Sequence, residues 1–252
     1  MTNRSKRSEQ TVPCHACPVR KLTRFQPLPE SQQAVVQQYR AGQTLLPAKH
    51  HLYREGELHG NIYTLFSGWV MLYKTLSNGG RQILRYALPG DFISFQADLQ
   101  APMNHSAQTL TECTLCVFPR QNLIQMLQTH PELGLQIAWI TARDMTLGQE
   151  YLVNIGRKNA KERLAFLFTE LFQRMGMHDP KIGNSIPFPM TQEDIADTLG
   201  LTLVHVNRTL RNLREEGLIN LSHHTLTILD YAQLAELAGF NNDTLATDQP
   251  LL

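Results

Sequence analysis

The most constraining feature of this 252-residue sequence is a pair of short helical patterns joined at Gly200. Thr191 and Asp194 have the spacing of a capping box at the start of the first pattern, and Gly200 supplies the tight turn that ends it. The apolar positions that let two crossing helices share a core are Ile195, Ala196, Leu199, Val206, Leu210 and Leu213. The segment from Thr191 to Arg214 is therefore predicted to be a helix-turn-helix.

The second helix of this motif, capped by Thr202, carries the side chains expected to face DNA. Its N-terminal end enters the major groove in such motifs and sets the next residues against base edges. The predicted DNA-binding residues are Thr191, Thr202, Leu203, Val204, His205, Asn207, Arg208 and Arg211. Arg208 suits guanine or a phosphate, and Val204 suits a thymine methyl. The alternative is a solvated face whose arginines pair with Glu215 and Glu216.

Beyond Gly217, residues 218–229 alternate as two short strands joined at Ser222-His223-His224. This pattern predicts a hairpin wing after the helix-turn-helix. The two histidines at its tip are positioned to touch a phosphate, although exposed turn residues often make no specific contact.

An earlier segment, from about Gly42 to Phe118, consists of short apolar or alternating runs at 62–66, 69–73, 83–88 and 115–118. Turn signals separate these runs, and Asn78-Gly79 is the sharpest hairpin signal among them. Strand-length runs at this spacing predict an all-β barrel or jelly roll.

After His130-Pro131 the hydrophobic period changes to that of one long helix of about 25 residues. Its stripe predicts a dimer interface made by Leu133, Ile137, Ile140, Asp144, Leu147 and Tyr151. A long helix beside a roll often pairs with its twin, and the alternative is a stripe that packs only on its own roll. Asp144 would either face its twin and act as a switch or rotate out to solvent.

The whole pattern predicts an α+β chain: a β-roll (jelly roll) like a cyclic-nucleotide-binding domain, a long dimerisation helix and a C-terminal winged helix-turn-helix. A further helix is expected over 159–175. The expected divisions are 1–28 for an N-terminal segment, 29–130 for the roll as sensor domain, 131–157 for the dimer helix, 158–240 for the DNA-binding domain and 241–252 for a tail.

Composition limits the partners of the chain. The formal net charge is only +1, so contact with nucleic acid must come from a local basic patch. The apolar runs are far shorter than the roughly 20 residues needed to span a bilayer, and the N-terminus lacks an apolar signal region. We therefore expect a cytoplasmic protein without a membrane segment.

The four cysteines form two C-x-x-C pairs, Cys14/Cys17 and Cys113/Cys116. In a reducing cytoplasm such pairs indicate metal or redox chemistry rather than structural disulfides. Residues three apart in a regular strand point to opposite faces, so the second pair can share a metal only if residues 112–115 bulge or turn.

The order of these parts resembles the Crp/Fnr family of bacterial regulators over roughly residues 14–239. The resemblance rests on Gly56, Ser67-Gly68, Pro89-Gly90-Asp91, the run Asn159-Ala-Lys-Glu-Arg-Leu164 and residues 191–218. It implies a homodimer on double-stranded promoter DNA of two-fold symmetry, an effector in or beside the roll, and contact with RNA polymerase during activation. It implies no enzymatic activity.

Within the family, the cyclic-nucleotide branch holds phosphate with Gly-Glu and Arg-Ser. This sequence has Gly90-Asp91 and His105-Ser106 instead, which argues against cyclic AMP as the ligand. Val204 stands where the Fnr and Crp branches of the family usually carry a base-reading glutamate. The DNA half-sites of those branches should therefore not be assumed for this chain.

The Fnr branch holds a [4Fe-4S] cluster with three N-terminal cysteines and one in the roll. Cys14, Cys17 and Cys116 match three of these positions, and Thr23 occupies the fourth. The resemblance therefore predicts an iron-sulfur cluster with Cys113 as the substitute ligand, giving the metal set Cys14, Cys17, Cys113 and Cys116. His15 would serve if Cys113 faces the core.

Other possibilities stay open: the thiols form a four-thiolate zinc site or a thiol-disulfide switch, or they are inert, and the regulator responds instead to a small-molecule effector. A thiol oxidoreductase is the remote alternative, because that chemistry normally sits at a helix N-terminus in a βαβ unit, which neither pair has.

Overall fold

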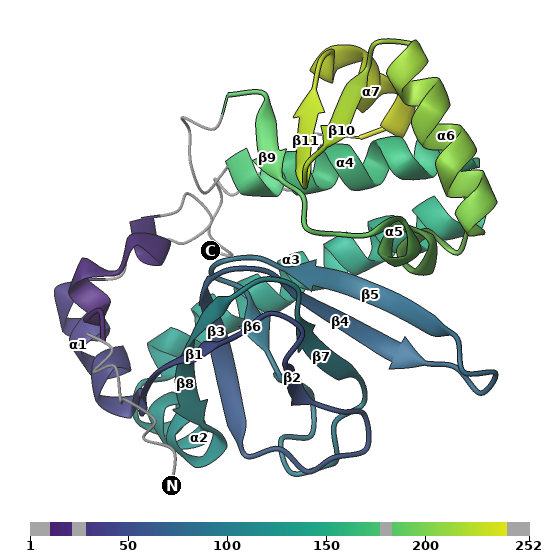
Figure 1. Ribbon diagram of the computed structural model, residues 1–252. Helices are drawn as coiled ribbons and strands as arrows, with labels where there is room; N and C mark the ends of the chain where they lie inside the picture. The colour runs from purple at the N-terminus through teal and green to yellow at the C-terminus, as the bar shows by residue number, and fades with distance from the viewer. Residues whose placement is uncertain (1–10, 22–28, 177–182, 241–252) are drawn as a thin grey trace, which may run out of the picture.

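The computed structural model describes residues 11–21, 29–176 and 183–240. Thr23 and the predicted tail at 241–252 lie outside these residues. Figure 1 shows a strand-rich N-terminal part, a long helix behind it and a smaller C-terminal domain beyond the edge of the strands. The predicted fold class is confirmed by this arrangement. In the described residues, no helix has the length and apolar character needed to cross a membrane.

The N-terminal part is a roll of two four-stranded sheets. The first sheet has the order β1 (Gly42–Leu46), β8 (Cys113–Pro119), β3 (Asn61–Ser67), β6 (Phe92–Ile93). The second has the order β2 (His51–Tyr53), β7 (Ser106–Thr109), β4 (Val70–Thr75), β5 (Arg81–Ala87). Alternating side chains such as Leu65, Val70 and Leu115 are fully buried between them, because a strand sends every second residue to the same face.

Two glycine turns give the roll its connections. Between β4 and β5, Gly79 has a φ of 80°, and the Asn78 Oδ1 accepts a hydrogen bond from the Gly80 N–H at 2.9 Å. Between β3 and β4, Gly68 has a φ of 94°, and a Cβ there would lie 2.4 Å from the Glu112 carbonyl oxygen. Only glycine fits this second turn without moving the backbone.

Short helices that the sequence analysis did not predict cover the outer face of the first sheet. They are η1 (Cys14–Ala16), η2 (Pro18–Lys21), α1 (Glu30–Tyr39) and α2 (Arg120–Thr129). Val36 of α1 and Leu123 of α2 pack with Ile62 and Phe118, which project outward from β3 and β8. Both faces of this sheet are therefore buried, and its strands lack the clean polar alternation of a one-sided sheet.

The long helix α3 spans Pro131–Arg157 and begins with proline, whose fixed φ suits the first helical position. Leu133, Ile140, Leu147 and Tyr151 are all at most 6% exposed within a single chain. The predicted dimer stripe thus has its partner in its own chain, which is the alternative considered from the sequence. Asp144 is also engaged, because its Oδ2 lies 2.9 Å from the Arg85 Nη1.

The C-terminal domain contains α4 (Ala160–Gly176), β9 (Ser185–Pro187), α5 (Gln192–Leu199), α6 (Leu203–Glu215), β10 (Ile219–Ser222), β11 (Thr225–Ile228) and α7 (Tyr231–Ala238). The predicted helix, helix-turn-helix and hairpin wing are all present, and β9 adds a third strand to the wing. All six apolar positions expected to form the helix-turn-helix core are buried.

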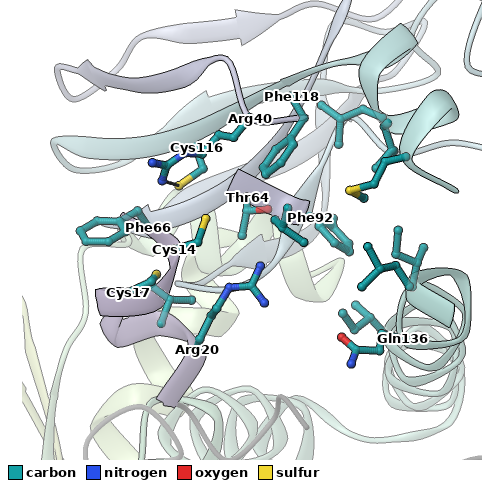
Figure 2. A pocket seen from close by; sticks show the side chains of 18 of the residues that line it. Cys14, Cys17, Arg20, Arg40, Thr64, Phe66, Phe92, Cys116, Phe118 and Gln136 are labelled. Carbon is teal, nitrogen blue, oxygen red and sulfur yellow. Dashed lines mark hydrogen bonds between the residues drawn. The ribbon is translucent and has the colours of Figure 1, made fainter. Parts of the chain in front are cut away.

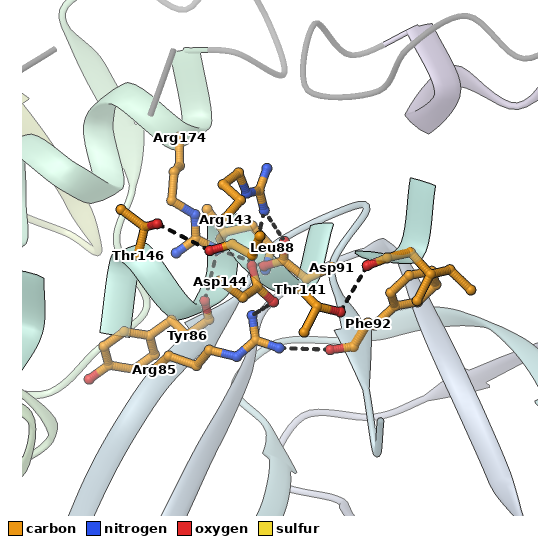
Figure 3. A network of polar contacts seen from close by, with 12 residues as sticks. Arg85, Tyr86, Leu88, Asp91, Phe92, Thr141, Arg143, Asp144, Thr146 and Arg174 are labelled. Carbon is orange, nitrogen blue, oxygen red and sulfur yellow. Dashed lines mark hydrogen bonds and ion pairs between the residues drawn. The ribbon is translucent and has the colours of Figure 1, made fainter. Parts of the chain in front are cut away.

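A buried network of charged groups joins the roll, α3 and α4 (Figure 3). The Arg174 Nη2 of α4 lies 2.6 Å from the Asp91 Oδ2 in the roll, and its Nη1 lies 2.9 Å from the Glu170 Oε1. The Tyr151 hydroxyl of α3 donates to the other Glu170 oxygen at 3.0 Å. Arg143 of α3 approaches the second Asp91 oxygen at 3.4 Å. Each buried carboxylate therefore has a cation.

A second contact joins the β4–β5 hairpin to the helix-turn-helix. The Arg81 guanidinium lies 2.7 Å from the Asp194 Oδ1 and 2.8 Å from the Asp197 Oδ2, both on α5. Behind it, the buried Tyr86 hydroxyl is 2.7 Å from the Thr198 Oγ1. The roll therefore contacts α5, the first helix of the helix-turn-helix, directly as well as through α3.

Replacement of the buried guanidinium is expected to destabilise the fold strongly. Arg174→Met should lower the free energy of unfolding by about 3–5 kcal/mol, since Asp91 and Glu170 would remain buried without their main partner. Lys161→Met, which removes an exposed pair with Glu216, should cost about 1 kcal/mol or less. Urea denaturation of both variants measures the difference, and equal losses would contradict this account of the network.

Candidate functional site

The helix pair of the reading motif is fixed by caps at both joints. The Thr191 Oγ1 accepts from the Asp194 N–H at 3.1 Å, and the Asp194 carboxylate accepts from the Thr191 N–H at 2.9 Å, which completes the capping box. Gly200 ends α5 in the left-handed conformation with a φ of 62°. The Thr202 Oγ1 then accepts from the His205 N–H at 3.3 Å to start α6. These caps help to set the angle between α5 and α6.

Helix α6 presents one face to solvent and buries the other. Val206, Leu210 and Leu213 are at most 1% exposed, whereas Val204 is 74% exposed. The other α6 residues predicted to contact DNA are also exposed: Leu203, His205, Asn207, Arg208 and Arg211. The exposed residues follow the start of the helix, where a base-reading helix places its contacts.

The arginines of this face are not held by the neighbouring glutamates. Among the described residues, neither Arg208 nor Arg211 forms an ion pair. Glu216 pairs instead with Lys161, at 2.5 Å. Arg214 differs from the other two, because its Nη2 donates to the Leu221 carbonyl oxygen of the wing at 3.1 Å. Two guanidiniums on α6 are therefore available to an anionic partner such as a phosphate backbone.

The wing ends in a tight two-residue turn. His223 and His224 have φ values of 49° and 56°, the conformation that matches the twist of the flanking strands. Both side chains are exposed. The turn therefore presents two imidazoles to solvent on the domain that carries α6.

The second cysteine pair is divided between the two faces of β8. The Cys113 side chain is fully buried between the sheets, with its Sγ 3.3 Å from the Trp69 carbonyl oxygen. Cys116 belongs to the cluster on the outer face. The register of β8 with β1 is continuous from Val117 to Cys113, so no bulge turns the two thiols together. The structure does not bring Cys113 to the other cysteines.

The remaining three cysteines meet at one cavity of about 110 Å³ (Figure 2). Cys14 and Cys17 come from the N-terminal turns, and Cys116 comes from β8. Helix α3 forms another wall with Leu133, Gln136, Ile137 and Ile140. The cavity therefore lies outside the roll's interior and in direct contact with α3.

Positive side chains surround these thiols. The Arg40 Nη1 lies 3.8 Å from the Cys116 Sγ, and the Gln43 Nε2 donates to the same sulfur at 3.4 Å. Burial raises the pKa of the Cys14 thiol above its ordinary value, against smaller lowering effects of Arg40 and Arg20. Burial thus favours the neutral thiol at Cys14, while the guanidiniums favour the thiolate.

Neither candidate for a fourth metal ligand reaches this cavity. Cys113 faces the roll's interior, and His15 is exposed and does not line the cavity. Within the described ranges, no group of three or more histidine, cysteine, aspartate or glutamate side chains is arranged to hold a metal ion.

Asp91 and His105 stand in place of phosphate-binding residues of the cyclic-nucleotide branch, and both are engaged with other side chains of this chain. Asp91 is 1% exposed and bound to Arg174, and the His105 Nε2 is 2.8 Å from the Tyr53 hydroxyl. Burial lowers the pKa of His105 to about 4, so its ring is neutral near pH 7. These side chains supply no cation for a cyclic phosphate.

Arg20, Arg40 and Gln43 lie beside the thiols although no sequence motif indicates it. They lie in three separate segments and match no motif, so no spacing joined them to the cysteines. A single arginine between helix and strand, such as Arg40, usually indicates only a solvated surface.

Two family models match this chain in succession. Residues 37–130 match the cyclic nucleotide-binding domain, and residues 162–237 match the Crp-like helix-turn-helix domain. Between them lies α3.

Curated relatives match across both parts. The nitrogen fixation regulation protein FixK of Rhizobium meliloti is 34% identical over 197 residues, covering 77% of this chain and 82% of that protein. The transcriptional activator protein FnrL of Cereibacter sphaeroides is 27% identical over 241 residues, covering 91% and 93%. The structure of FixK2 from Bradyrhizobium japonicum superposes with a TM-score of 0.71 at 25% identity, covering 77% of this chain and 96% of that one.

Removal of the unpaired guanidinium in the second turn of α6 is expected to weaken DNA binding. Arg208→Ala should reduce affinity about 5- to 150-fold, equivalent to about 1–3 kcal/mol for one lost base or phosphate contact. Duplexes selected from a random library by the unmodified protein supply the sites, and gel shift measures the affinity. Arg54→Ala, an exposed arginine on the roll, is the matched control. Unchanged affinity in Arg208→Ala would refute the assignment of α6 as the reading helix.

Proposed function

Because the chain belongs to the Crp/Fnr family of transcription regulators, we propose that it binds promoter DNA of two-fold symmetry as a homodimer and receives its signal at the α3 cavity. The observation that carries this proposal is the position of α3, which forms one wall of the cavity and leads into the DNA-binding domain. A signal at the cavity therefore acts on the element that positions the reading helix.

The exposed face of α6 supports specific contact with DNA. In this proposal Val204, Asn207 and Arg208, all exposed, contact base edges, while Arg211 and the wing contact phosphates. Thr191 and Thr202 cap the N-termini of α5 and α6, and their backbone groups contact phosphate in this proposal. RNA polymerase is the further partner when the protein activates transcription, and the cytoplasm is its compartment.

We place the dimer seam on the face of α3 opposite the stripe predicted from the sequence. The exposed apolar residues Leu135, Met145 and Leu152 are 60%, 61% and 73% exposed in the single chain. With small and polar neighbours they form a repeat of three and four residues: Leu135, Ala138, Ala142, Met145, Gln149, Leu152. This is the spacing of a two-stranded coiled coil, and alanine at two positions permits close approach of the helices.

A four-thiolate iron-sulfur cluster or zinc site does not fit this arrangement. Either site needs four ligands, and the described residues place three thiols at the cavity. Cys113 would have to leave the roll's interior. Its Sγ packs so closely against Gly68 there that a Cβ at that position would lie 2.6 Å from the sulfur. We therefore no longer propose a [4Fe-4S] cluster on Cys14, Cys17, Cys113 and Cys116. The candidate functional thiols are the three at the cavity, without Cys113.

These three thiols still support a redox response. The thiol of Cys116 can form a disulfide with that of Cys14 or Cys17, with loss of two protons and two electrons to an oxidant such as a peroxide. The N-terminal turns would then be tied to β8, next to α3. Arg40 and Gln43 donate hydrogen bonds to the sulfur of Cys116 and hold it at the wall of the cavity.

The redox response should depend on Cys116 and not on Cys113. Oxidation by hydrogen peroxide should change DNA affinity in the unmodified protein and in Cys113→Ala, and should have no effect in Cys116→Ala. Gel shift on reduced and oxidised samples measures the change. In a separate preparation, the unmodified protein and both variants are purified anaerobically and analysed for iron, sulfide and zinc. A stoichiometric metal content that is lost in Cys113→Ala would contradict the assignment of the thiols.

A charge in the seam should separate the two chains. Met145→Glu should shift the protein from dimer to monomer, because two carboxylates would face each other across an apolar contact. Sedimentation equilibrium at micromolar concentration measures the mass. Arg157→Glu, an exposed change near the end of the same helix and outside the repeat, should stay dimeric. A Met145→Glu protein that remains fully dimeric would refute this seam.

A further inference from the structure

The α3 cavity combines positive charge with apolar walls. Arg20 and Arg40 line it, and no aspartate or glutamate of the described residues does so. In Figure 2 the side chain of Arg20 extends into the cavity from the N-terminal turns, while Arg40 lies on the far side beside Cys116. Two cations from different segments thus face the same small space.

Within the described ranges, the buried Arg40 forms no ion pair with a carboxylate. Only 8% of the residue is exposed, and its hydrogen-bond partners among the described residues are neutral: the Val12 carbonyl oxygen at 2.9 Å, the Gln37 Oε1 at 3.2 Å and the Cys116 sulfur. The buried Nε has no hydrogen-bond partner. A buried charge is costly unless it is paired, so an anion at the cavity would satisfy an existing requirement.

The rest of the lining is apolar and the space is small. Phe92, Phe118, Leu133 and Ile140 form walls around the cavity of about 110 Å³. A cavity of about 150 Å³ lined by similar side chains accommodates benzene, so the occupant here has a body of only a few carbon atoms. A bare metal cation is disfavoured, because two guanidiniums would repel it.

We infer that this cavity binds a small organic anion, with its carboxylate or equivalent group on Arg40 and Arg20 and a short apolar body against Phe118 and Ile140. The inference rests on the proposed function of the cavity as the signal site, and it names the chemical class of the signal. Binding would tie the N-terminal turns to the wall formed by α3. It would also shield the thiols of Cys14, Cys17 and Cys116.

Linear carboxylates provide the test, with hexanoate as the probe and hexanamide as its neutral counterpart of nearly equal size. Calorimetry on the reduced full-length protein should show binding of hexanoate and at least tenfold weaker binding of hexanamide, since the amide lacks the charge that strengthens a hydrogen bond to guanidinium. Affinity along the series from butanoate to decanoate should pass through a maximum, because the walls limit the length. Equal affinity for acid and amide, or no binding at any length, would overturn the inference.

Variants separate the role of Arg40 from a general loss of structure. Arg40→Gln should weaken hexanoate binding at least tenfold, Arg40→Lys should retain part of it, and Arg54→Gln on the roll should retain all of it. Thermal melting checks that each variant is folded. Undiminished binding in a folded Arg40→Gln would overturn the inference, and so would loss of binding in Arg54→Gln.

A second measurement keeps this inference distinct from the proposed function. Gel shift with the selected duplexes is repeated with and without hexanoate. DNA binding without calorimetric hexanoate binding would refute the ligand class and leave the regulator function standing. Hexanoate binding through Arg40 with no selective DNA binding would support the ligand site and refute the reading head.

Discussion

The pairing of Arg174 with Asp91 and Glu170 is the interaction on which the arrangement of the domains depends. The three side chains come from the C-terminal domain and from the Pro-Gly-Asp turn of the roll, and all are almost inaccessible to water. Charged groups at such depth are tolerated only when each has a partner of opposite sign. The reading domain cannot leave the roll without exposing or unpairing these charges, so any large rearrangement must break the whole group at once. Two alternative arrangements are therefore more compatible with this interface than a continuum of small displacements.

Much of the fold could be predicted because local patterns agree with the final packing. The capped helix pair, the strand-length runs and the glycine turns each follow from the residues within about a dozen positions. The limits appear at α3, where the sequence contains two stripes on opposite sides. The more apolar one, with Leu133, Ile140 and Leu147, was assigned to the partner, yet it covers the chain's own core. Hydrophobicity identifies buried faces, and it does not distinguish burial within a chain from burial between chains.

The candidate site shows the same division between local and distant information. The period of a β-strand correctly indicated that Cys113 and Cys116 point to opposite faces unless the backbone is irregular, and the irregularity in this sheet falls in β3, between Leu65 and Ser67. The convergence of Arg20 and Arg40 on the thiols had no local signal. Their positions depend on how the N-terminal turns pack over the outer face of β8. Charge placed by tertiary packing alone is invisible to motif analysis.

The length of α3 has a mechanical consequence. Its 27 residues extend over about 40 Å at the usual rise per residue. The cavity contacts its first third, between Leu133 and Ile140, while the reading domain follows its last residue. A rigid rod of this length tilted by about 5° moves its far end by about 3.5 Å, close to one base-pair step of about 3.4 Å along DNA. The helix therefore acts as a lever: two discrete arrangements of the interface that differ by a tilt of only about 5° would bring the two DNA-binding domains of a dimer into or out of phase with the duplex.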